Sequence, residues 1–170
     1  MAARIVHHGY RFISSGTKKG PSQLFTTENQ MLFQERVKRL KNSSKNQALS
    51  VKNASVLVPL VLVDNDPCLL FTQRSLALNA HAGEVCYPGG KFDARFDNNL
   101  IDTAFRETEE ELGINRNSFE VWETLPPLKA RDGKSMIKPI VALLKVTLKD
   151  LSYWLHYIMP YICSILVQPF

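Results

Sequence analysis

Cysteine is scarce in this chain of 170 residues, and the patterns in which cysteine stabilises or activates proteins are missing. The three cysteines, Cys68, Cys86 and Cys163, are odd in number and widely spaced. They therefore predict neither a disulfide framework nor a zinc site, and they fit a reducing compartment. Cys86 lies between Val85 and Tyr87, and no motif places a histidine beside it. A buried strand residue is a better interpretation of Cys86 than a nucleophile.

Acidic residues are absent from residues 1–27, which hold four basic ones: Arg4, Arg11, Lys18 and Lys19. Because the whole chain carries a net charge of +5, residues 28–170 carry only +1 (5 − 4). A remainder this close to neutral argues against nucleic-acid binding. On a helical wheel, apolar side chains of residues 5–13 share one side while Arg4 and Arg11 share the other. This composition is typical of a mitochondrial presequence. We therefore predict a presequence at 1–27 and a mitochondrial location; the alternatives are a disordered N-terminus and a cytoplasmic location.

Formal charge is also missing from Leu151–Phe170. Twenty uncharged residues are long enough to cross a bilayer. Pro160 near the middle, together with His156 and Gln168, makes a poor membrane span, so the segment is expected to be an apolar tail.

The sequence contains no internal repeat and no low-complexity tract, and its length suits one domain with an extension. Thr27 and Gln30 form a possible capping box for a helix that continues to about Lys41. Basic residues alternate there with apolar ones, which favours an amphipathic helix over a phosphate-binding helix. Residues 42–53 are polar and predict a linker.

Apolar and β-branched runs predict the strands of the domain. They lie at Ser55–Val63, Cys68–Gln73, Val85–Tyr87, Phe119–Thr124 and Lys138–Leu148. The first two form a hairpin around the turn at Asp64–Pro67, and Pro59 suggests an edge strand or a bulge. Pro88-Gly89-Gly90 is predicted to be a turn. A helix is expected at Leu100–Leu112, with Gly113 ending it.

Three carboxylates share one face of that helix. Glu107, Glu110 and Glu111 stand at i, i+3 and i+4, within about 100° of one another, and Glu109 points roughly the opposite way. Their mutual repulsion is costly unless a cation lies among them, and all-oxygen ligation is what Mg²⁺ and Mn²⁺ prefer. Since Mg²⁺ usually works alongside substrate phosphates, the pattern predicts a phosphate-ester or diphosphate site. A solvated acidic helix is the alternative.

The motif has a wider context. The run Arg106-Glu107-x-x-Glu110-Glu111-x-Gly113-Ile114 resembles the second half of the signature of the Nudix hydrolases. Upstream, Leu69–Ser75, Leu78, His81, Gly83–Val85 and Tyr87–Gly90 are similar to the pattern of the coenzyme A diphosphatases, and the resemblance covers roughly Ser55–Ile140. The first half of the signature departs from the family. Its usual Glu falls on Asn98 and its usual Gly on Phe92, while Asp97, the nearest acid, is not expected to be a ligand.

The resemblance implies an α/β fold, a mixed sheet sandwiched between helices with a catalytic loop-helix-loop. It implies Mg²⁺- or Mn²⁺-dependent hydrolysis of coenzyme A or acyl-CoA to 3′,5′-ADP and (acyl-)4′-phosphopantetheine. The alternatives are another nucleoside diphosphate derivative as substrate, or a catalytically inactive binding protein. Expected domains are a helix and linker at 28–54, an incomplete hydrolase domain at 55–150 and the apolar tail at 151–170. Relatives of this kind would continue with another strand and a closing helix.

Site residues are carried over from the resemblance. The expected metal ligands are Glu107, Glu110, Glu111 and the backbone carbonyl of Gly90, and Arg106 is expected to orient a glutamate of its own helix. Substrate contacts are expected from Arg74, His81, Gly83, Gly89 and Gly90. Arg74 is the candidate for the 3′-phosphate because arginine grips phosphate bidentately. His81 is equally well explained as a structural loop residue. The general base is left open among the helix glutamates, Glu120 and Glu123.

Overall fold

A computed structural model of the protein describes residues 4–7, 24–43, 53–63, 66–79, 81–145 and 162–169. Most of the expected presequence, most of the linker and the first part of the apolar tail lie outside these residues. The described chain forms nine strands, two α-helices and one short 3₁₀ helix. The helices are α1 (Thr27–Ser43), α2 (Leu100–Leu112) and η2 (Arg116–Ser118). The strands are β1 (Arg4–His7), β2 (Asn53–Val63), β3 (Asp66–Arg74), β4 (Val85–Cys86), β5 (Gly89–Lys91), β6 (Phe119–Thr124), β7 (Leu128–Lys129), β8 (Met136–Leu144) and β9 (Ile162–Pro169).

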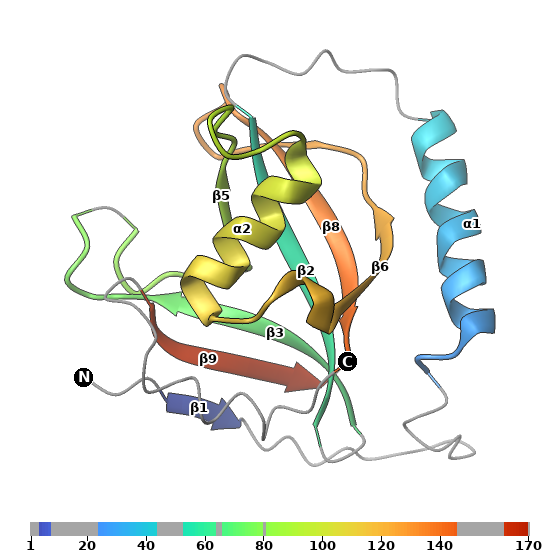
Figure 1. The fold of residues 1–170 in the computed structure, drawn as a ribbon, viewed down its shortest axis with the longest axis horizontal. Helices are drawn as coiled ribbons and strands as arrows, with labels where there is room; N and C mark the ends of the chain where they lie inside the picture. Colours follow the sequence, from blue (N-terminus) through green and yellow to red (C-terminus); the bar gives the residue numbers. More distant parts are fainter. Residues whose placement is uncertain are drawn as a thin grey trace.

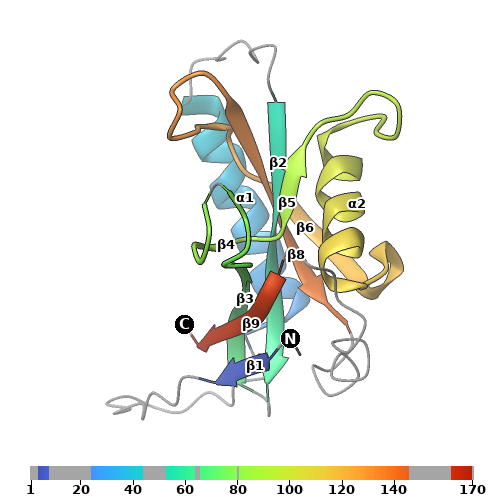
Figure 2. The same ribbon diagram turned by 90° about the vertical axis from the view of Figure 1, so that its left-hand side faces the viewer.

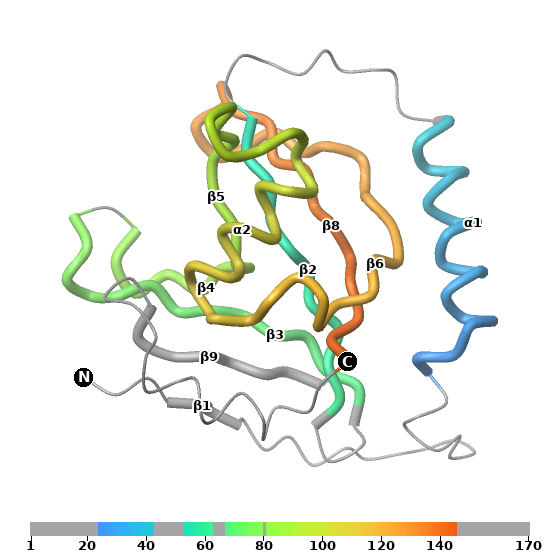
Figure 3. The backbone as a smooth tube through the Cα atoms, viewed as in Figure 1, coloured from blue at the N-terminus to red at the C-terminus, as the bar shows by residue number. Residues whose placement is uncertain are grey.

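All nine strands belong to one mixed sheet. Its main order is β1-β9-β3-β2-β8-β6, and the short strands β4, β5 and β7 pair with β3, β2 and β8. Strands β2 and β8 run parallel, whereas β2 and β3 form the predicted antiparallel hairpin. Strand β8 begins at Met136 rather than at Lys138, the predicted first residue. Figure 3 follows the chain through this arrangement.

The two helices lie on opposite faces of the sheet (Figures 1 and 2). Helix α2 packs on β2 and β5, and α1 reaches the sheet mainly at β6. This is the predicted α/β/α sandwich. The arrangement gives the sheet two separate apolar layers, one beneath each helix.

Pro59 lies in the middle of the sheet, so its prediction as a mark of an edge strand is wrong. Strand β2 pairs with β8 along one side and, on the other, with β5 as far as Val56 and with β3 from Leu60 onward. The N–H of Leu57 points to that second side, where it donates to Pro88 O over 2.8 Å. The nitrogen of Pro59 points the same way because the direction alternates along a strand. It therefore falls in the gap between β5 and β3, where no ladder bond is needed.

The apolar layer under α2 forms the larger core of the domain. Leu57 and Leu70 of the sheet are 0% exposed, and Ala104, Phe105 and Leu112 of α2 are 0–3% exposed. Full burial of a leucine or phenylalanine side chain contributes roughly 1.5–3 kcal/mol. Burial on this scale fixes α2 firmly on the sheet.

The layer under α1 is smaller. Val37 is the buried apolar side chain of α1, and Phe33 packs against Trp122 of β6 with ring centroids 6.1 Å apart. The helix begins at Thr27, and its cap is Thr26, whose hydroxyl accepts from Asn29 N over 3.2 Å. The predicted cap was one residue too late, whereas the predicted helix itself is confirmed.

The chain ends meet at one margin of the sheet. Arg4–His7, which the helical wheel treated as part of an amphipathic helix, form β1 and pair in parallel with β9. Strand β9 lies within the expected apolar tail and pairs with β3 along Cys68–Arg74. Neither described helix combines the length and hydrophobicity that crossing a bilayer requires.

Candidate active site

Helix α2 is capped at both ends, and its end at Gly113 is the predicted one. The side chain of Asn99 caps the first turn by accepting from Ile101 N (2.8 Å) and Asp102 N (3.1 Å). At the other end Gly113 adopts a left-handed conformation with φ 67°, and its N–H donates to Glu109 O over 2.8 Å. Such caps hold the last turn of a helix in register. The glutamates of α2 therefore project in directions that the caps and the buried face define.

Gly89 and Gly90 face this helix from the sheet. They were predicted as a turn, but with Lys91 they form β5, which pairs with β2. Gly89 has φ 150°, and a Cβ there would collide with the backbone of Ser55 and Val56. Only glycine permits this approach of β5 to β2. The strand was missed because two glycines have almost no intrinsic strand preference.

Two glutamates of α2 meet the glycine pair. The carboxylate of Glu107 occupies the space that a Cβ on Gly90 would take. Glu111 Oε2 accepts from Gly89 N over 3.3 Å. Glu110 lies at the rim: its side chain is 59% exposed, and its Oε1 accepts from Arg106 Nη1 over 3.1 Å. Its charge still acts on Glu107 and Glu111. Of the three predicted glutamates, the structure places Glu107 and Glu111 against the glycine pair and Glu110 at its rim.

Glu109 points away from this group, as the helical periodicity predicts. It is exposed, and its Oε1 accepts from Asn115 Nδ2 over 3.0 Å. Within the described part of the chain, no three acidic, histidine or cysteine side chains converge on one point as a complete ligand set. The site thus places the carboxylates of Glu107 and Glu111 against a glycine backbone. Glu110, one helical turn after Glu107, lies at the rim.

The environment of these carboxylates disfavours their negative charge. Burial raises the pKa of Glu111 to about 7, and the charge of Glu107 adds to this, against the opposing effects of the Gly89 N–H and the nearby Arg74. Burial also raises the pKa of Glu107, although its bond to Arg106 acts in the opposite direction. Partly buried acids that repel each other suit a hard cation, which would relieve both effects. The residues present therefore fit Mg²⁺ or Mn²⁺.

Arg106 forms hydrogen bonds to three carboxylates at the rim of the site. Its guanidinium donates to Glu107 Oε1 (2.9 Å) and Glu110 Oε1 (3.1 Å), and to both oxygens of Asp97. The Asp97 contacts are 2.8 Å from Nε and 3.1 Å from Nη2. One arginine thus bonds two glutamates of its own helix while the preceding loop holds it in place.

Asp97 has a fully buried side chain and four hydrogen bonds. Besides Arg106, it accepts from Thr103 Oγ1 and from Asp93 N, each over 2.9 Å. The bond to Arg106 and these further donors hold its pKa below the ordinary value, against the opposing effect of burial. Asp97 therefore serves as the anchor of Arg106. Sequence reasoning missed this role because the contact joins two residues across an irregular loop that has no periodic signal.

The segment from Arg74 to Glu84 forms a closed loop between β3 and β4. Arg74 N donates to Glu84 O (3.0 Å), and Gly83 N donates to Arg74 O (3.2 Å). Gly83 has φ 73°, and His81, at φ 56°, contacts Glu84 Oε2 through Nδ1 over 2.9 Å. His81 thus has a protein partner in the described structure, and its two interpretations, as a loop residue and as a substrate contact, remain predictions. Arg74 lies close enough to Glu111 for their charges to interact.

The two downstream acids considered as bases lie on β6, the strand at the far end of the sheet order. Glu123 accepts from Lys41 Nζ of α1 over 2.8 Å, which places its carboxylate on the α1 side. Glu120 is exposed. The structure therefore groups neither of them with Glu107 and Glu111.

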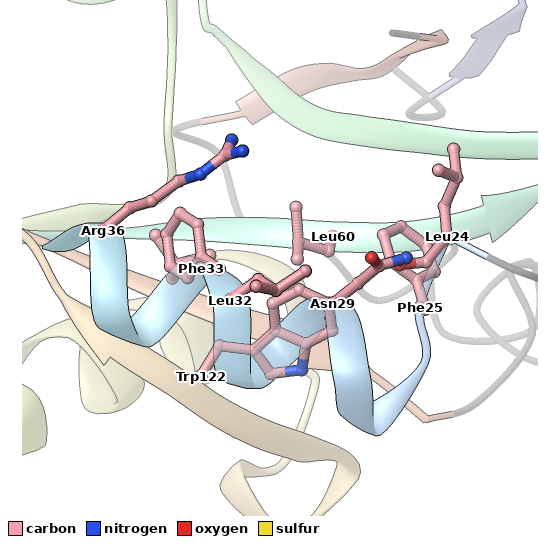
Figure 4. A pocket seen from close by; sticks show the side chains of 9 residues that line it. Leu24, Phe25, Asn29, Leu32, Phe33, Arg36, Leu60 and Trp122 are labelled. Carbon is pink, nitrogen blue, oxygen red and sulfur yellow. The ribbon is translucent and has the colours of Figure 1, made fainter.

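A hollow of about 350 Å³ also lies on the α1 side. Figure 4 shows its lining, in which Phe33, Leu60 and Trp122 gather between helix and sheet, and Arg36 extends at one end. Among the described residues no acid lines it. This hollow is separate from the carboxylate site on α2.

Similarity to known proteins identifies the family of this domain. Residues 51–150 match the NUDIX domain, so the chain belongs to the Nudix family. Members of this family act on small nucleotide-derived substrates, commonly with divalent metal ions.

Three curated relatives illustrate the range within the family. Nudix hydrolase 3 of Caenorhabditis elegans is 42% identical over 59% of this chain and 39% of its own length. Mitochondrial coenzyme A diphosphatase NUDT8 of Mus musculus is 49% identical over 52% of this chain and 42% of its own length. Uncharacterized Nudix hydrolase NudL of Escherichia fergusonii is 38% identical over 71% of this chain and 60% of its own length. The chain therefore spans less than two thirds of each of these relatives.

Solved structures share the fold. NrtR of Shewanella oneidensis superposes with a TM-score of 0.50 at 17% identity, covering 69% of this chain and 51% of that one. At this identity the likeness concerns the fold alone.

Proposed function

We propose that this chain carries the site of a metal-dependent diphosphatase that hydrolyses coenzyme A or acyl-CoA to 3′,5′-ADP and (acyl-)4′-phosphopantetheine. One observation carries the proposal: Glu107 and Glu111, partly buried on α2, meet the glycine backbone of β5. The similarity to the mouse relative, which is named a coenzyme A diphosphatase, supports this choice of substrate.

The proposed cation ligands are Glu107, Glu111 and the backbone carbonyl of Gly90, with Glu110 joining them from the rim. A bound Mg²⁺ or Mn²⁺ would supply charge neutralisation on the diphosphate oxygens and a lowered pKa for an attacking water. Glu110 needs only a side-chain rotation to leave Arg106, because it is more than half exposed. A glutamate of α2 that does not coordinate the cation would accept the proton from the water.

Arg106 and Asp97 are assigned positioning roles in this scheme. Arg106 limits repulsion between Glu107 and Glu110 by bonding both, and buried Asp97 holds the guanidinium in place. Arg74, whose charge interacts with Glu111, is proposed to bind a substrate phosphate. Gly83 is proposed to shape the Arg74–Glu84 loop, and Gly89 to let β5 approach β2 beneath the carboxylates. His81 is proposed to hold the shape of the same loop through its contact with Glu84.

Another nucleoside diphosphate derivative is the competing substrate class, since other relatives are named only as Nudix hydrolases. For location we propose mitochondria, on the basis of the acid-free, amphipathic N-terminus and the mitochondrial name of the mouse relative. A reporter fused to residues 1–29 is expected to enter mitochondria. Cytosolic residence of that fusion would contradict this assignment.

A substrate panel tests the proposal. The full chain is incubated with Mg²⁺ or Mn²⁺ and coenzyme A, dephospho-coenzyme A or ADP-ribose, and products are separated by chromatography. We expect coenzyme A to be cleaved most efficiently, with release of 3′,5′-ADP. A clear preference for ADP-ribose would reject coenzyme A as the substrate while keeping the diphosphatase activity, and absence of turnover on all three would reject both.

A further inference from the structure

A basic hairpin lies at the same end of the sheet as the glycine strand of the candidate site. It joins β7 to β8 and carries Lys129, Arg131 and Lys134. Its one acid, Asp132, fixes the turn: Oδ1 accepts from Lys134 N and Ser135 N, each over 2.9 Å. The hairpin therefore presents its basic residues from a turn that its own hydrogen bonds hold in shape.

The strand register places this hairpin at the same end of the sheet as the glycine strand β5, with β2 between them. Lys129 pairs with Met136, Met136 pairs with Asn53 at the start of β2, and the neighbouring Ala54 pairs with Lys91 at the end of β5. In Figure 2, β5 lies between α2 on one side and, on the other, the β7–β8 turn and the loop before β4. The site and the hairpin thus border the same end of the sheet.

Arg131 connects the hairpin to the Arg74–Glu84 loop. Its Nη1 lies 3.9 Å from Glu84 Oε1, while Glu84 Oε2 contacts His81 Nδ1 at 2.9 Å. The Arg131 side chain is 92% exposed, and 3.9 Å exceeds hydrogen-bond distance. Such a pair contributes little to stability, so exchanging Glu84 for another anion costs little.

The geometry points to Arg131 as a specificity-determining residue that binds a phosphate monoester carried by the substrate outside the cleaved diphosphate. A phosphate carries more charge than the Glu84 carboxylate and accepts two parallel bonds from a guanidinium. It therefore displaces Glu84, which faces Arg131 at 3.9 Å in the free protein. This inference rests on the proposed function: in coenzyme A the monoester is the 3′-phosphate of the ribose. Arg74, on the Glu111 side, then serves the phosphates at the cleaved bond.

The kinetic test uses Arg131→Gln in the full chain, with Lys38→Gln as the matched control. Lys38 is an exposed cation on α1, across the sheet from α2. For coenzyme A we expect Arg131→Gln to raise KM about threefold to tenfold with unchanged kcat, as loss of an exposed charge-assisted contact implies. The KM for dephospho-coenzyme A is expected to stay the same. Lys38→Gln is expected to change neither substrate's KM.

Glu84→Gln gives a second readout with the opposite sign. Removing the competing carboxylate is expected to lower KM for coenzyme A, whereas loss of a merely structural contact would raise it or leave it unchanged. Equal effects of Arg131→Gln on both substrates, or a raised or unchanged KM in Glu84→Gln, would overturn the inference.

Binding separates this inference from the proposed function. Calorimetry without metal measures the affinity of the same variants for 3′,5′-ADP and for 5′-AMP. Arg131→Gln is expected to weaken 3′,5′-ADP about threefold to tenfold and to leave 5′-AMP unchanged. Unchanged affinity for 3′,5′-ADP would reject the role of Arg131 even if turnover is normal. Absence of turnover together with this selective loss would reject the proposed reaction alone.

Discussion

The two faces of the sheet differ in how firmly their helices are held. Helix α2 is capped by Asn99 and Gly113 and buries Ala104, Phe105 and Leu112. Helix α1 buries Val37 but leaves large apolar side chains exposed, among them Met31 at 65%, Leu32 at 47% and Leu40 at 56%. The ionisable groups of the candidate site lie with the firmly held helix, and the apolar hollow lies with the other.

This difference follows from what each side has to do. A cation site requires carboxylates that stay close together despite their repulsion, and only a rigid frame with a counter-charge maintains that. Caps, core burial and the Asp97–Arg106 contact supply the frame on α2. On α1 the polar contacts to the sheet, such as Gln34 Nε2 to Trp122 O at 2.8 Å, fix the position of the helix without grouping like charges.

The largest expected effect lies on the α2 side. Glu111→Gln removes a charge and keeps the shape and the hydrogen bond to Gly89, so turnover should fall on the order of 10²–10⁴-fold, as for loss of a catalytic group. Because that charge is partly buried next to Glu107, urea unfolding of the metal-free variant should show equal or higher stability. The control is Glu109→Gln, which is exposed and should retain nearly full activity. Similar losses in both variants would mean that the assignment of the helix faces is wrong.

Truncating an aromatic side chain on the α1 side is expected to lower the free energy of unfolding strongly and to change kcat little. Trp122 is 7% exposed and packs on Phe25 and Phe33. Trp122→Ala should cost about 3–5 kcal/mol in urea unfolding, the usual range for truncating a buried aromatic side chain. Assayed well below the unfolding midpoint, its kcat should stay within about twofold of the wild type, since the site lies on the other face. A kcat reduced as strongly as in Glu111→Gln would show that the two faces are coupled.

Asp97→Asn should lower both stability and activity. The loss of activity should be smaller than in Glu111→Gln, and the loss of stability smaller than in Trp122→Ala. Breaking a buried ion pair typically costs 3–5 kcal/mol. Because Arg106 keeps its bonds to Glu107 and Glu110 in the variant, we expect a smaller loss of about 2–3 kcal/mol in the free energy of unfolding. Because the folded-state pKa of Asp97 is lowered, its contribution is complete above the ordinary Asp pKa of about 3.9 and disappears as pH falls through the folded value. The stability gap between wild type and variant should therefore close under acid conditions.

Asp93→Asn is the control for that change, since its side chain is paired with exposed Arg95. It should leave the unfolding midpoint at pH 7 nearly unchanged. If the Asp97→Asn gap widened below pH 4 instead of closing, the paired carboxylate would not be its source.

Local signals predicted the parts of the fold that depend on neighbouring residues. The bounds of α2, its end at Gly113 and the β2–β3 hairpin all follow from apolar spacing, a glycine stop and a turn sequence. Membership of the domain family likewise follows from residues close together in the chain. These features need no knowledge of what packs against them.

The features that sequence reasoning missed depend on contacts that no periodic or turn pattern in the sequence identifies. Pro59 is tolerated in a central strand because β5 and β3 leave a gap beside it, and Gly89 belongs to a strand because β2 lies against it. Asp97 anchors Arg106 through a loop of irregular length, so its role is visible only in three dimensions. The spacing placed Glu107, Glu110 and Glu111 on one face, but the glycine strand and Arg106 determine which partner each carboxylate contacts.

The smallest effect is expected for Glu123→Gln, and it tests whether the chemistry is confined to the α2 side. Glu123 was one of the acids left open as general base. It bonds Lys41 of α1 at 2.8 Å, and this contact together with the Thr124 N–H keeps its pKa below the ordinary value although burial opposes them. A carboxylate so held is a weak base, and it lies on the far side of the sheet.

Replacement of Glu123 by Gln should change kcat by less than about twofold and stability by about 0.5–1 kcal/mol, the contribution of a modest ion pair. Lys41→Gln should reproduce the same loss of stability, because it breaks the same contact. If Glu123→Gln alone abolished turnover with the fold intact, β6 would have to supply the base, and the separation of the two faces would fail.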